Sequence, residues 1–204
     1  MSQYMAVIPF AVVVISVLAA IILIDWFNNR RIGDNLMQVA LATNGELEKD
    51  GNNYTLKGAY CGRQFTIYMK PRGAGKNKAV YYHVHLESES DMRMVCLKQY
   101  VKSRLDARIN EMEPLDIPDE DFSMVHRILV DNKKIGQSLI DKPHILEAIK
   151  KIMEKYTEMS IKKDITLLKR YHVKLTEPEI LLATLENLIK IAVEVENLCK
   201  TTVK

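Results

Sequence analysis

Two histidines separated by a single residue, His83 and His85, are the pair whose type and spacing best suit chemistry. Residues two apart on a β-strand project from the same face, so both imidazoles could bind one transition-metal ion. The other histidines and two thiols could complete such a site, but no spacing identifies them as ligands: His126, His144, His172, Cys61 and Cys96. A solvated or hydrogen-bonded histidine pair on the polar face of a strand is the alternative. We therefore expect no resident cofactor, with a metal at His83 and His85 as the competing hypothesis.

A glycine-rich basic stretch runs from Lys70 to Lys78. A phosphate-binding loop needs Gly-x-x-x-x-Gly-Lys followed by Ser or Thr. Here Lys70 stands where the first glycine is needed, and Asn77 follows Lys76, so the motif fails twice. The stretch instead predicts a hairpin loop whose basic side chains could contact anionic headgroups, at roughly 1 kcal/mol per charge. These side chains are Lys70, Arg72, Lys76 and Lys78.

Other catalytic signatures are absent from the sequence. It holds no G-x-S-x-G, H-E-x-x-H, C-x-x-C or dinucleotide-binding motif. Beyond residue 27 the chain carries 29 basic and 25 acidic residues, because Asp25 is the only charge before that point. This weak positive charge lacks the concentrated basic patch of a nucleic-acid-binding protein, so we expect no nucleic-acid partner.

The elements that must position these residues begin with an apolar stretch. The first 24 residues carry no charged side chain, and residues 5–27 are long enough to cross a hydrocarbon core of about 30 Å. Trp26 suits the far interface, since an indole prefers the headgroup level. A cleaved signal peptide is the alternative, but no basic residue precedes the stretch, which exceeds the usual apolar core of roughly 7–15 residues. We predict a transmembrane anchor over residues 1–27.

The charges that follow the anchor predict its orientation. Arg30 and Arg31 lie directly after it, in an expected juxtamembrane linker over residues 28–33. The positive-inside rule then places the domain in the cytoplasm of a single-pass cell-membrane protein, with both arginines at the membrane surface. An odd, sparse set of cysteines, unlike a secreted disulfide framework, agrees: Cys61, Cys96 and Cys199.

Residues 34–204 are expected to form one soluble α+β domain, with a mainly antiparallel sheet and flanking helices. Apolar periodicity predicts helices near residues 32–43, 100–109, 135–140, 143–156 and 176 onward. Alternation predicts strands near residues 54–60, 65–69, 80–86, 94–97, 122–130, 159–161 and 165–173. The acidic, proline-containing segment 111–121 is a loop and the one candidate for a subdomain boundary.

The stretch Gly58-Ala-Tyr60-Cys-Gly62-Arg63, followed by an alternating strand, carries a family resemblance. It resembles a G-x-Y-x-G-R element of uncharacterised, membrane-anchored prokaryotic proteins. The acidic stretch that ends at Asp121-Phe122 and the Arg127–Asp131 strand are similar to theirs too. The likeness spans roughly residues 35–200. It implies the single-pass α+β architecture and no activity.

Three functional hypotheses remain. The leading one is a non-catalytic, membrane-tethered protein-interaction module, an accessory subunit of a membrane complex, with the lipid bilayer and a protein as partners. The alternative is a ligand- or metal-binding domain for sensing or delivery at the cytoplasmic membrane surface, with His83 and His85 in its site. An enzyme, a hydrolase or transferase acting near the membrane, comes third, because carboxylate catalysts leave no local sequence signature.

Overall fold

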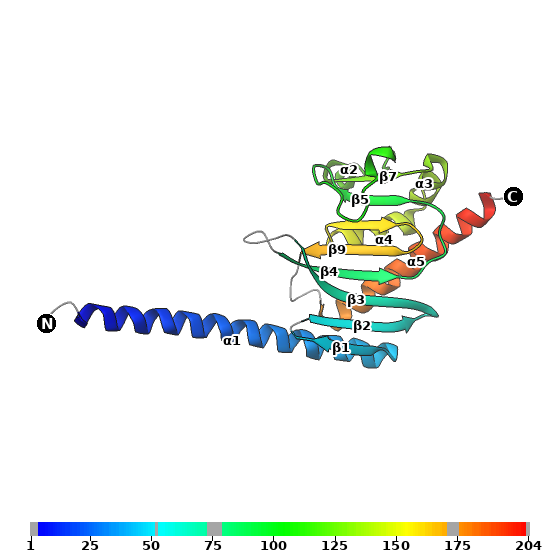
Figure 1. The fold of residues 1–204 in the computed structure, drawn as a ribbon. Coiled ribbons are helices and arrows are strands. Elements are labelled where there is room, and N and C mark those ends of the chain that lie inside the picture. The colour runs from blue at the N-terminus through cyan, green and yellow to red at the C-terminus, as the bar shows by residue number, and fades with distance from the viewer. Residues whose placement is uncertain (1–3, 52, 73–78, 171–175, 203–204) are drawn as a thin grey trace.

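The computed structural model describes residues 4–51, 53–72, 79–170 and 176–202, and it has the predicted α+β architecture (Figure 1). The helices, including one 3-10 helix, are α1 (Tyr4–Thr43), η2 (Ile109–Glu111), α2 (Glu120–Val125), α3 (Lys133–Ile140), α4 (Pro143–Met153) and α5 (Pro178–Thr202). The strands are β1 (Glu46–Asp50), β2 (Asn53–Tyr60), β3 (Arg63–Arg72), β4 (Ala79–Leu86), β5 (Met94–Lys98), β6 (Glu113–Pro114), β7 (His126–Val130), β8 (Glu158–Ile161) and β9 (Ile165–Arg170).

The strands form a single sheet in the order β1-β2-β3-β4-β9-β8-β5-β7-β6. Every neighbouring pair is antiparallel. Glu113 and Pro114 form the edge strand β6, which pairs with β7. The acidic segment 111–121, the candidate subdomain boundary, therefore supplies a strand to the sheet.

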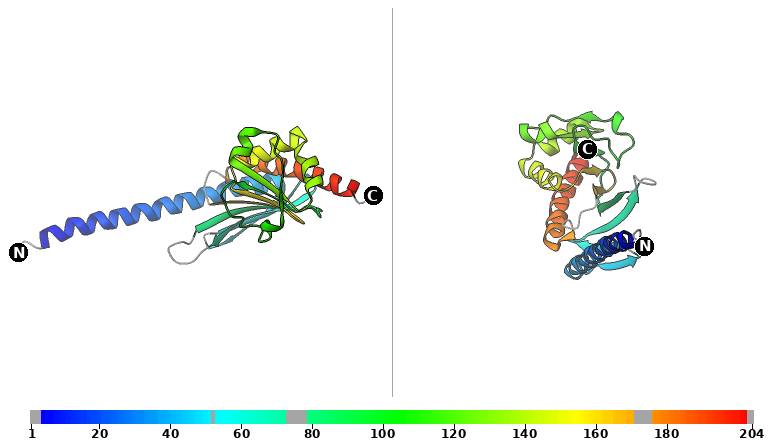
Figure 2. Two further views of the ribbon diagram at one scale, coloured as in Figure 1. Left: turned by 90° about the horizontal axis from the view of Figure 1, so that it is seen from above. Right: turned by 90° about the vertical axis from the view of Figure 1, so that its left-hand side faces the viewer.

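One face of the sheet is covered by helices and holds the main core. α5, α4 and the second half of α1 lie on this face (Figures 1 and 2). Alternation along the strands turns Leu56, Ile67, Val84 and Leu167 inward, and each is fully buried. The helices contribute their apolar stripes, including Ile149 and Leu185, to the same continuous cluster.

α1 is one unbroken helix of 40 residues. Segment 28–33, predicted as a linker, is helical and continues directly into the domain, where Ile32, Leu36 and Val39 are buried. The first half of α1 projects away from the domain (Figures 1 and 2), and its large apolar side chains from Val13 to Ile24 are exposed. Within the described residues, it is the one helix long and apolar enough to cross a membrane.

The other face of the sheet is partly covered by an irregular segment. The helix predicted over residues 100–109 is wrong, because the chain there forms no helix before η2. The Glu158 carboxylate instead accepts hydrogen bonds from the backbone N–H groups of Arg104 and Leu105, at 2.8 and 3.0 Å, and from the Ser103 hydroxyl. Ile109 then packs on a second, small apolar cluster with Val95, Leu97, Met112 and Leu129.

The strand predicted over residues 122–130 begins only at His126. Residues 120–125 form the short helix α2, because the Asp119 carboxylate caps it by accepting from the Phe122 N–H at 2.8 Å. Alternation alone could not separate this capped turn from the strand that follows it.

Candidate functional site

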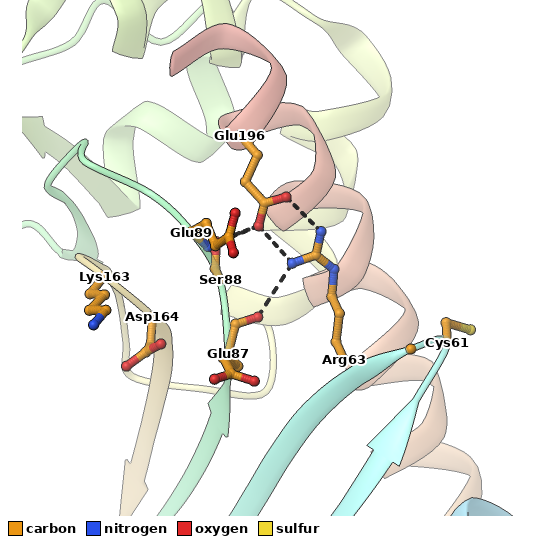
Figure 3. A pocket seen from close by; sticks show the side chains of 9 residues that line it. Cys61, Arg63, Glu87, Ser88, Glu89, Lys163, Asp164 and Glu196 are labelled. Atoms are coloured by element: carbon orange, nitrogen blue, oxygen red, sulfur yellow. Dashed lines mark hydrogen bonds and ion pairs between the residues drawn. The ribbon is translucent and has the colours of Figure 1, made fainter. Parts of the chain in front are cut away.

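An open polar groove lies beside the β2–β3 turn and the chain that follows β4 (Figure 3). This is the end of the sheet opposite the projecting half of α1 (Figure 1). The volume of the groove is about 600 Å³. A smaller hollow of about 250 Å³ adjoins it, with Lys163 and Asp164 common to both walls. We call the larger cavity the distal groove, and its lining residues are Cys61, Gly62, Arg63, Glu87, Ser88, Glu89, Lys163, Asp164 and Glu196.

The distal groove is built around an ion pair between β3 and α5. Arg63 donates two parallel hydrogen bonds to the Glu196 carboxylate, at 2.6 and 2.8 Å (Figure 3). The Ser88 hydroxyl and the Glu89 backbone N–H donate to the same carboxylate, at 3.2 and 3.0 Å. The hydrogen bonds from Arg63, helped by the Glu89 N–H and opposed by burial, hold the pKa of Glu196 at about 2. The carboxylate is therefore fully ionised near neutral pH.

A tight β-hairpin brings Arg63 to this position. Tyr60 and Arg63 pair directly across the two-residue turn Cys61-Gly62, where both residues have positive φ, 48° and 78°. Gly58 leaves room for the Phe65 ring, since a Cβ there would lie 2.8 Å from the ring. The Tyr60 hydroxyl lies 3.3 Å from a carboxylate oxygen of Glu186 on α5. Each fixed position of the G-x-Y-x-G-R element thus helps to shape or dock this hairpin.

His83 and His85 lie on one face of β4, as predicted, but their surroundings differ. His83 is only 1% exposed, and its ring stacks on Tyr68 with a centroid distance of 4.7 Å. His83 is therefore not solvated, because neighbouring side chains cover it. His85 is half-exposed, with Nδ1 3.0 Å from Thr166 Oγ1 and Nε2 3.3 Å from Asp164 Oδ2.

The other possible metal ligands are dispersed. His126 stacks on Phe122, Cys96 is buried, Cys61 is in the distal groove, and His144 is exposed on α4. His172 lies outside the described residues. Over the described ranges, no group of three His, Cys, Asp or Glu side chains is placed to hold a metal ion. The metal site at His83 and His85 stays a prediction.

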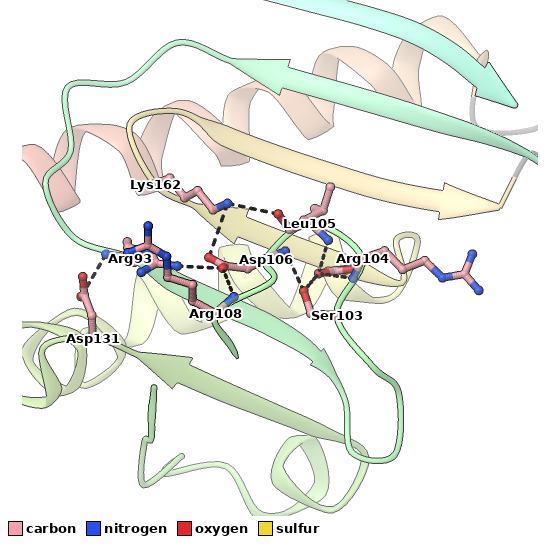
Figure 4. Close-up of polar contacts among 9 residues, drawn as sticks. Arg93, Ser103, Arg104, Leu105, Asp106, Arg108, Asp131 and Lys162 are labelled. Atoms are coloured by element: carbon pink, nitrogen blue, oxygen red, sulfur yellow. Dashed lines mark hydrogen bonds and ion pairs between the residues drawn. The ribbon is translucent and has the colours of Figure 1, made fainter. Parts of the chain in front are cut away.

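A second buried carboxylate, Asp106, fixes the irregular segment beside the smaller hollow (Figure 4). Arg93 Nη2 and the Arg108 backbone N–H donate to it at 2.7 and 2.9 Å, and Lys162 Nζ lies 3.6 Å away. Burial alone would raise the pKa of Asp106. The hydrogen bond from Arg108 and the charges of Lys162 and Arg93 outweigh that effect and lower it. Leu105, which directly precedes Asp106 in the chain, lines the hollow.

Of the basic residues predicted to meet the membrane surface, Arg30, Arg31 and Lys70 lie toward the other end of the domain. Arg30 lies over the Trp26 ring at 5.7 Å, and Arg31 forms an exposed ion pair with Glu177 at 3.2 Å. Lys70 is exposed near the end of β3, on the side from which α1 projects (Figure 1). Arg72 ends that strand, and its side chain lies outside the described residues, as do Lys76 and Lys78 entirely. Their contact with headgroups stays a prediction.

Comparisons with known proteins give little beyond this geometry. No protein-family model and no curated protein matches the chain. Among solved structures, it is similar in fold to the crystal structure of the mycobacterial trehalose monomycolate transport factor A, TtfA. The TM-score is 0.48, with 10% sequence identity over 84% of this chain and 93% of that chain. At that level the likeness says nothing about what this chain does.

Sequence reasoning missed three buried carboxylates that organise the domain, Glu196, Asp106 and Glu158. One signal for Glu196 was available. Leu188, Ala192 and Glu196 succeed one another at intervals of four residues, so the charge falls on the apolar stripe of α5. A charge in that position predicts a buried partner, which Arg63 provides. Asp106 and Glu158 lie in or beside irregular chain, where no periodicity marks them.

Proposed function

We propose that this protein is a non-catalytic, membrane-tethered interaction module, an accessory subunit of a membrane complex. The observation that carries the proposal is the continuity of α1 from an exposed apolar segment into the core of the domain. Ile32, Leu36 and Val39 are buried on the same helix that projects from the domain, so anchor and domain share one continuous helix. A continuous helix between anchor and domain restricts how a binding surface on the domain is oriented relative to the membrane.

The projecting segment has the properties of a membrane span. Its exposed side chains include Ile21, Ile22, Leu23 and Ile24, four consecutive residues that point to all sides of the helix and leave no polar face. A helix that is apolar all round and satisfies its own backbone hydrogen bonds suits the hydrocarbon interior. Arg30 and Arg31 at its end favour a cytoplasmic domain.

The distal groove suits binding rather than catalysis. Its most buried charges, Arg63 and Glu196, form an ion pair with each other. With a pKa of about 2, Glu196 cannot act as a general acid or base near neutral pH. The lining holds four carboxylates against two cations, a net charge of −2: Glu87, Glu89, Asp164 and Glu196 against Arg63 and Lys163. An open groove of this charge fits a basic segment of a partner protein.

Extraction of the native protein in mild detergent, followed by native mass spectrometry, tests the proposal. We expect a stoichiometric protein partner to travel with the wild type. The double variant Glu87→Lys, Glu89→Lys should lose it, because both side chains are exposed in the groove and their reversal repels a basic segment. Glu154→Lys, an exposed reversal on another surface, should keep the partner. A lone monomer in every preparation would contradict the proposal.

The orientation has its own test. Cys61 is exposed at the hairpin turn. In the Cys199→Ser variant, a membrane-impermeant maleimide should label Cys61 in broken cells and leave intact cells unlabelled. Labelling of intact cells to the same extent would place the domain outside the cytoplasm.

A second candidate function, binding of a small ligand or metal ion, is favoured by the hollow beside His85. Zinc, copper or nickel should then raise the thermal stability of the full-length wild type, since a ligand of the folded state stabilises it. His85→Ala should abolish the effect, whereas His144→Ala, at an exposed position of α4, should preserve it. The absence of any shift with the wild type would remove the metal-binding version.

A further inference from the structure

Four large apolar side chains stand in solvent where two distant segments of the chain meet. Tyr100 is 100% exposed and Met124 is 70% exposed, and Val101 and Val125 are exposed beside them. Gln99 joins the segments, because its backbone N–H donates to the Val125 carbonyl at 2.9 Å and its side chain donates to Ser123 O at 2.7 Å. We call Tyr100, Val101, Met124 and Val125 the apolar tip.

The fold itself does not use these side chains. Beyond residue 30, eight large apolar side chains are exposed within the described ranges, and five of them gather at one end of the sheet: the four of the apolar tip and Val80 at the start of β4. The remaining three lie on the outer surfaces of α1 and α5: Met37, Leu41 and Val193. Such a concentration marks a surface that contacts something outside the domain.

The apolar tip lies at the end of the sheet that faces the anchor. Because adjacent strands are antiparallel from β2 through to β7, the start of β2, the end of β5 and the start of β7 share one end. Tyr54, near the start of β2, packs against Gly33, where a Cβ would lie only 2.7 Å from the Tyr54 hydroxyl. At Gly33, α1 leaves the domain toward its exposed apolar half, and Figure 1 shows this end of the sheet on that side.

The charges around the apolar tip are of both signs. Lys98 and Lys102 flank Tyr100 and Val101, and Arg127 donates to the Val101 carbonyl at 3.0 Å. Glu120 and Asp121 lie one helical turn before Met124 and Val125. The apolar side chains themselves need no anionic lipid to enter a bilayer. A tyrosine among aliphatic side chains suits the interfacial region of a bilayer, where its ring is buried and its hydroxyl stays hydrated.

We infer that the apolar tip inserts into the interfacial region of the lipid bilayer, as a second membrane contact that fixes the tilt of the domain on its anchor. The inference rests on the proposed membrane anchoring by α1. It concerns different residues from the basic hairpin, and it requires no anionic lipid.

Depth-dependent quenching on the full-length protein in phosphatidylcholine liposomes tests it. Met124→Cys, in a Cys61→Ser, Cys199→Ser background, carries an environment-sensitive fluorophore, and a fraction of the lipids carry bromine in their acyl chains. We expect a blue-shifted emission quenched at least two-fold by the brominated lipid. The same fluorophore at Glu89→Cys, in the distal groove, should be unquenched.

Trp26, the single tryptophan, reports on the anchor in unlabelled protein. Quenching of Trp26 without quenching at Met124 would overturn the inference and leave the anchoring intact. Absence of both would remove the anchoring as well. Emission at position 124 that shifts only when a protein partner is added, with no lipid quenching, would also overturn the inference, since the tip would then bind protein.

A substitution control separates insertion from mere proximity. Tyr100→Ser with Val125→Ser should lower the quenching at position 124 at least two-fold, because the apolar contact is lost. Met37→Ser with Leu41→Ser, which removes exposed apolar surface from α1 away from the tip, should leave it unchanged. Equal quenching in both pairs would contradict the insertion.

Discussion

At the end of the sheet far from the anchor, charged side chains meet in hydrogen-bonded pairs, whereas at the near end large apolar side chains stand uncovered. Arg63 and Glu196 are mostly buried, with side chains 20% and 11% exposed. The hydrogen bonds between them replace those that each charged group would make with water. Tyr100 and Met124 have no such compensation within the domain, because solvent surrounds them. The difference teaches that the polar end is part of the stability of the fold, while the apolar end serves a contact beyond it.

Among changes at the two ends of the sheet, removal of Arg63 should have the largest effect. Arg63→Ala leaves the Glu196 carboxylate buried without its guanidinium partner, which should lower the free energy of unfolding by about 3 kcal/mol. Urea unfolding in mild detergent, followed by circular dichroism, measures the change. Lys57→Ala removes an exposed ion pair with Glu48 and should cost less than about 1 kcal/mol. Similar small losses in both variants would show that the distal pair contributes no more than a surface one.

Acid should weaken the same pair. The pKa of Glu196 is depressed from 4.5 to about 2 in the folded protein, so its contribution is complete above about pH 4.5 and is lost as the pH falls toward 2. The loss should reach roughly 3 kcal/mol, because lowering a pKa by one corresponds to about 1.4 kcal/mol. The free energy of unfolding, measured by urea titration from pH 5 to pH 2, should fall more steeply in the wild type than in Glu196→Gln. Parallel curves would contradict the depressed pKa.

The hairpin that carries Arg63 should respond to backbone strain. Gly62→Ala places a side chain at φ 78°, a conformation that costs L-residues about 1–2 kcal/mol. Gly62→Asn should lose less, since asparagine tolerates left-handed backbone. Thermal unfolding of both variants beside the wild type tests the order. Equal losses would mean that the turn relaxes to another conformation.

The smallest effect on stability is expected at the apolar tip. Met124→Ala should change the free energy of unfolding by less than about 0.5 kcal/mol, because the side chain is exposed. Met159→Ala, in the core at β8, should cost about 2–5 kcal/mol. A loss at Met124 comparable with that at Met159 would show that the tip packs within the domain, which would break the contrast between the two ends.

The local patterns of the sequence were sufficient for much of the architecture. The uncharged N-terminal stretch, the alternating strands on either side of Cys61-Gly62, and the apolar stripe of α5 each predicted an element that the structure contains. Periodicity and composition act over a few residues, so they report where a chain can form a helix or a strand. The same reasoning placed His83 and His85 on one face of β4.

Tertiary structure alone decided how these elements combine. It made α1 continuous through segment 28–33, because Ile32 and Leu36 pack in the core and hold the helix there. It kept residues 100–108 irregular, because the Glu158 carboxylate, more than fifty residues away, binds their backbone N–H groups. Pairings at such sequence separations leave no local pattern. For this physical reason the G-x-Y-x-G-R element could be recognised in the sequence, but the ion pair of its Arg63 with Glu196 could be found only in the folded structure.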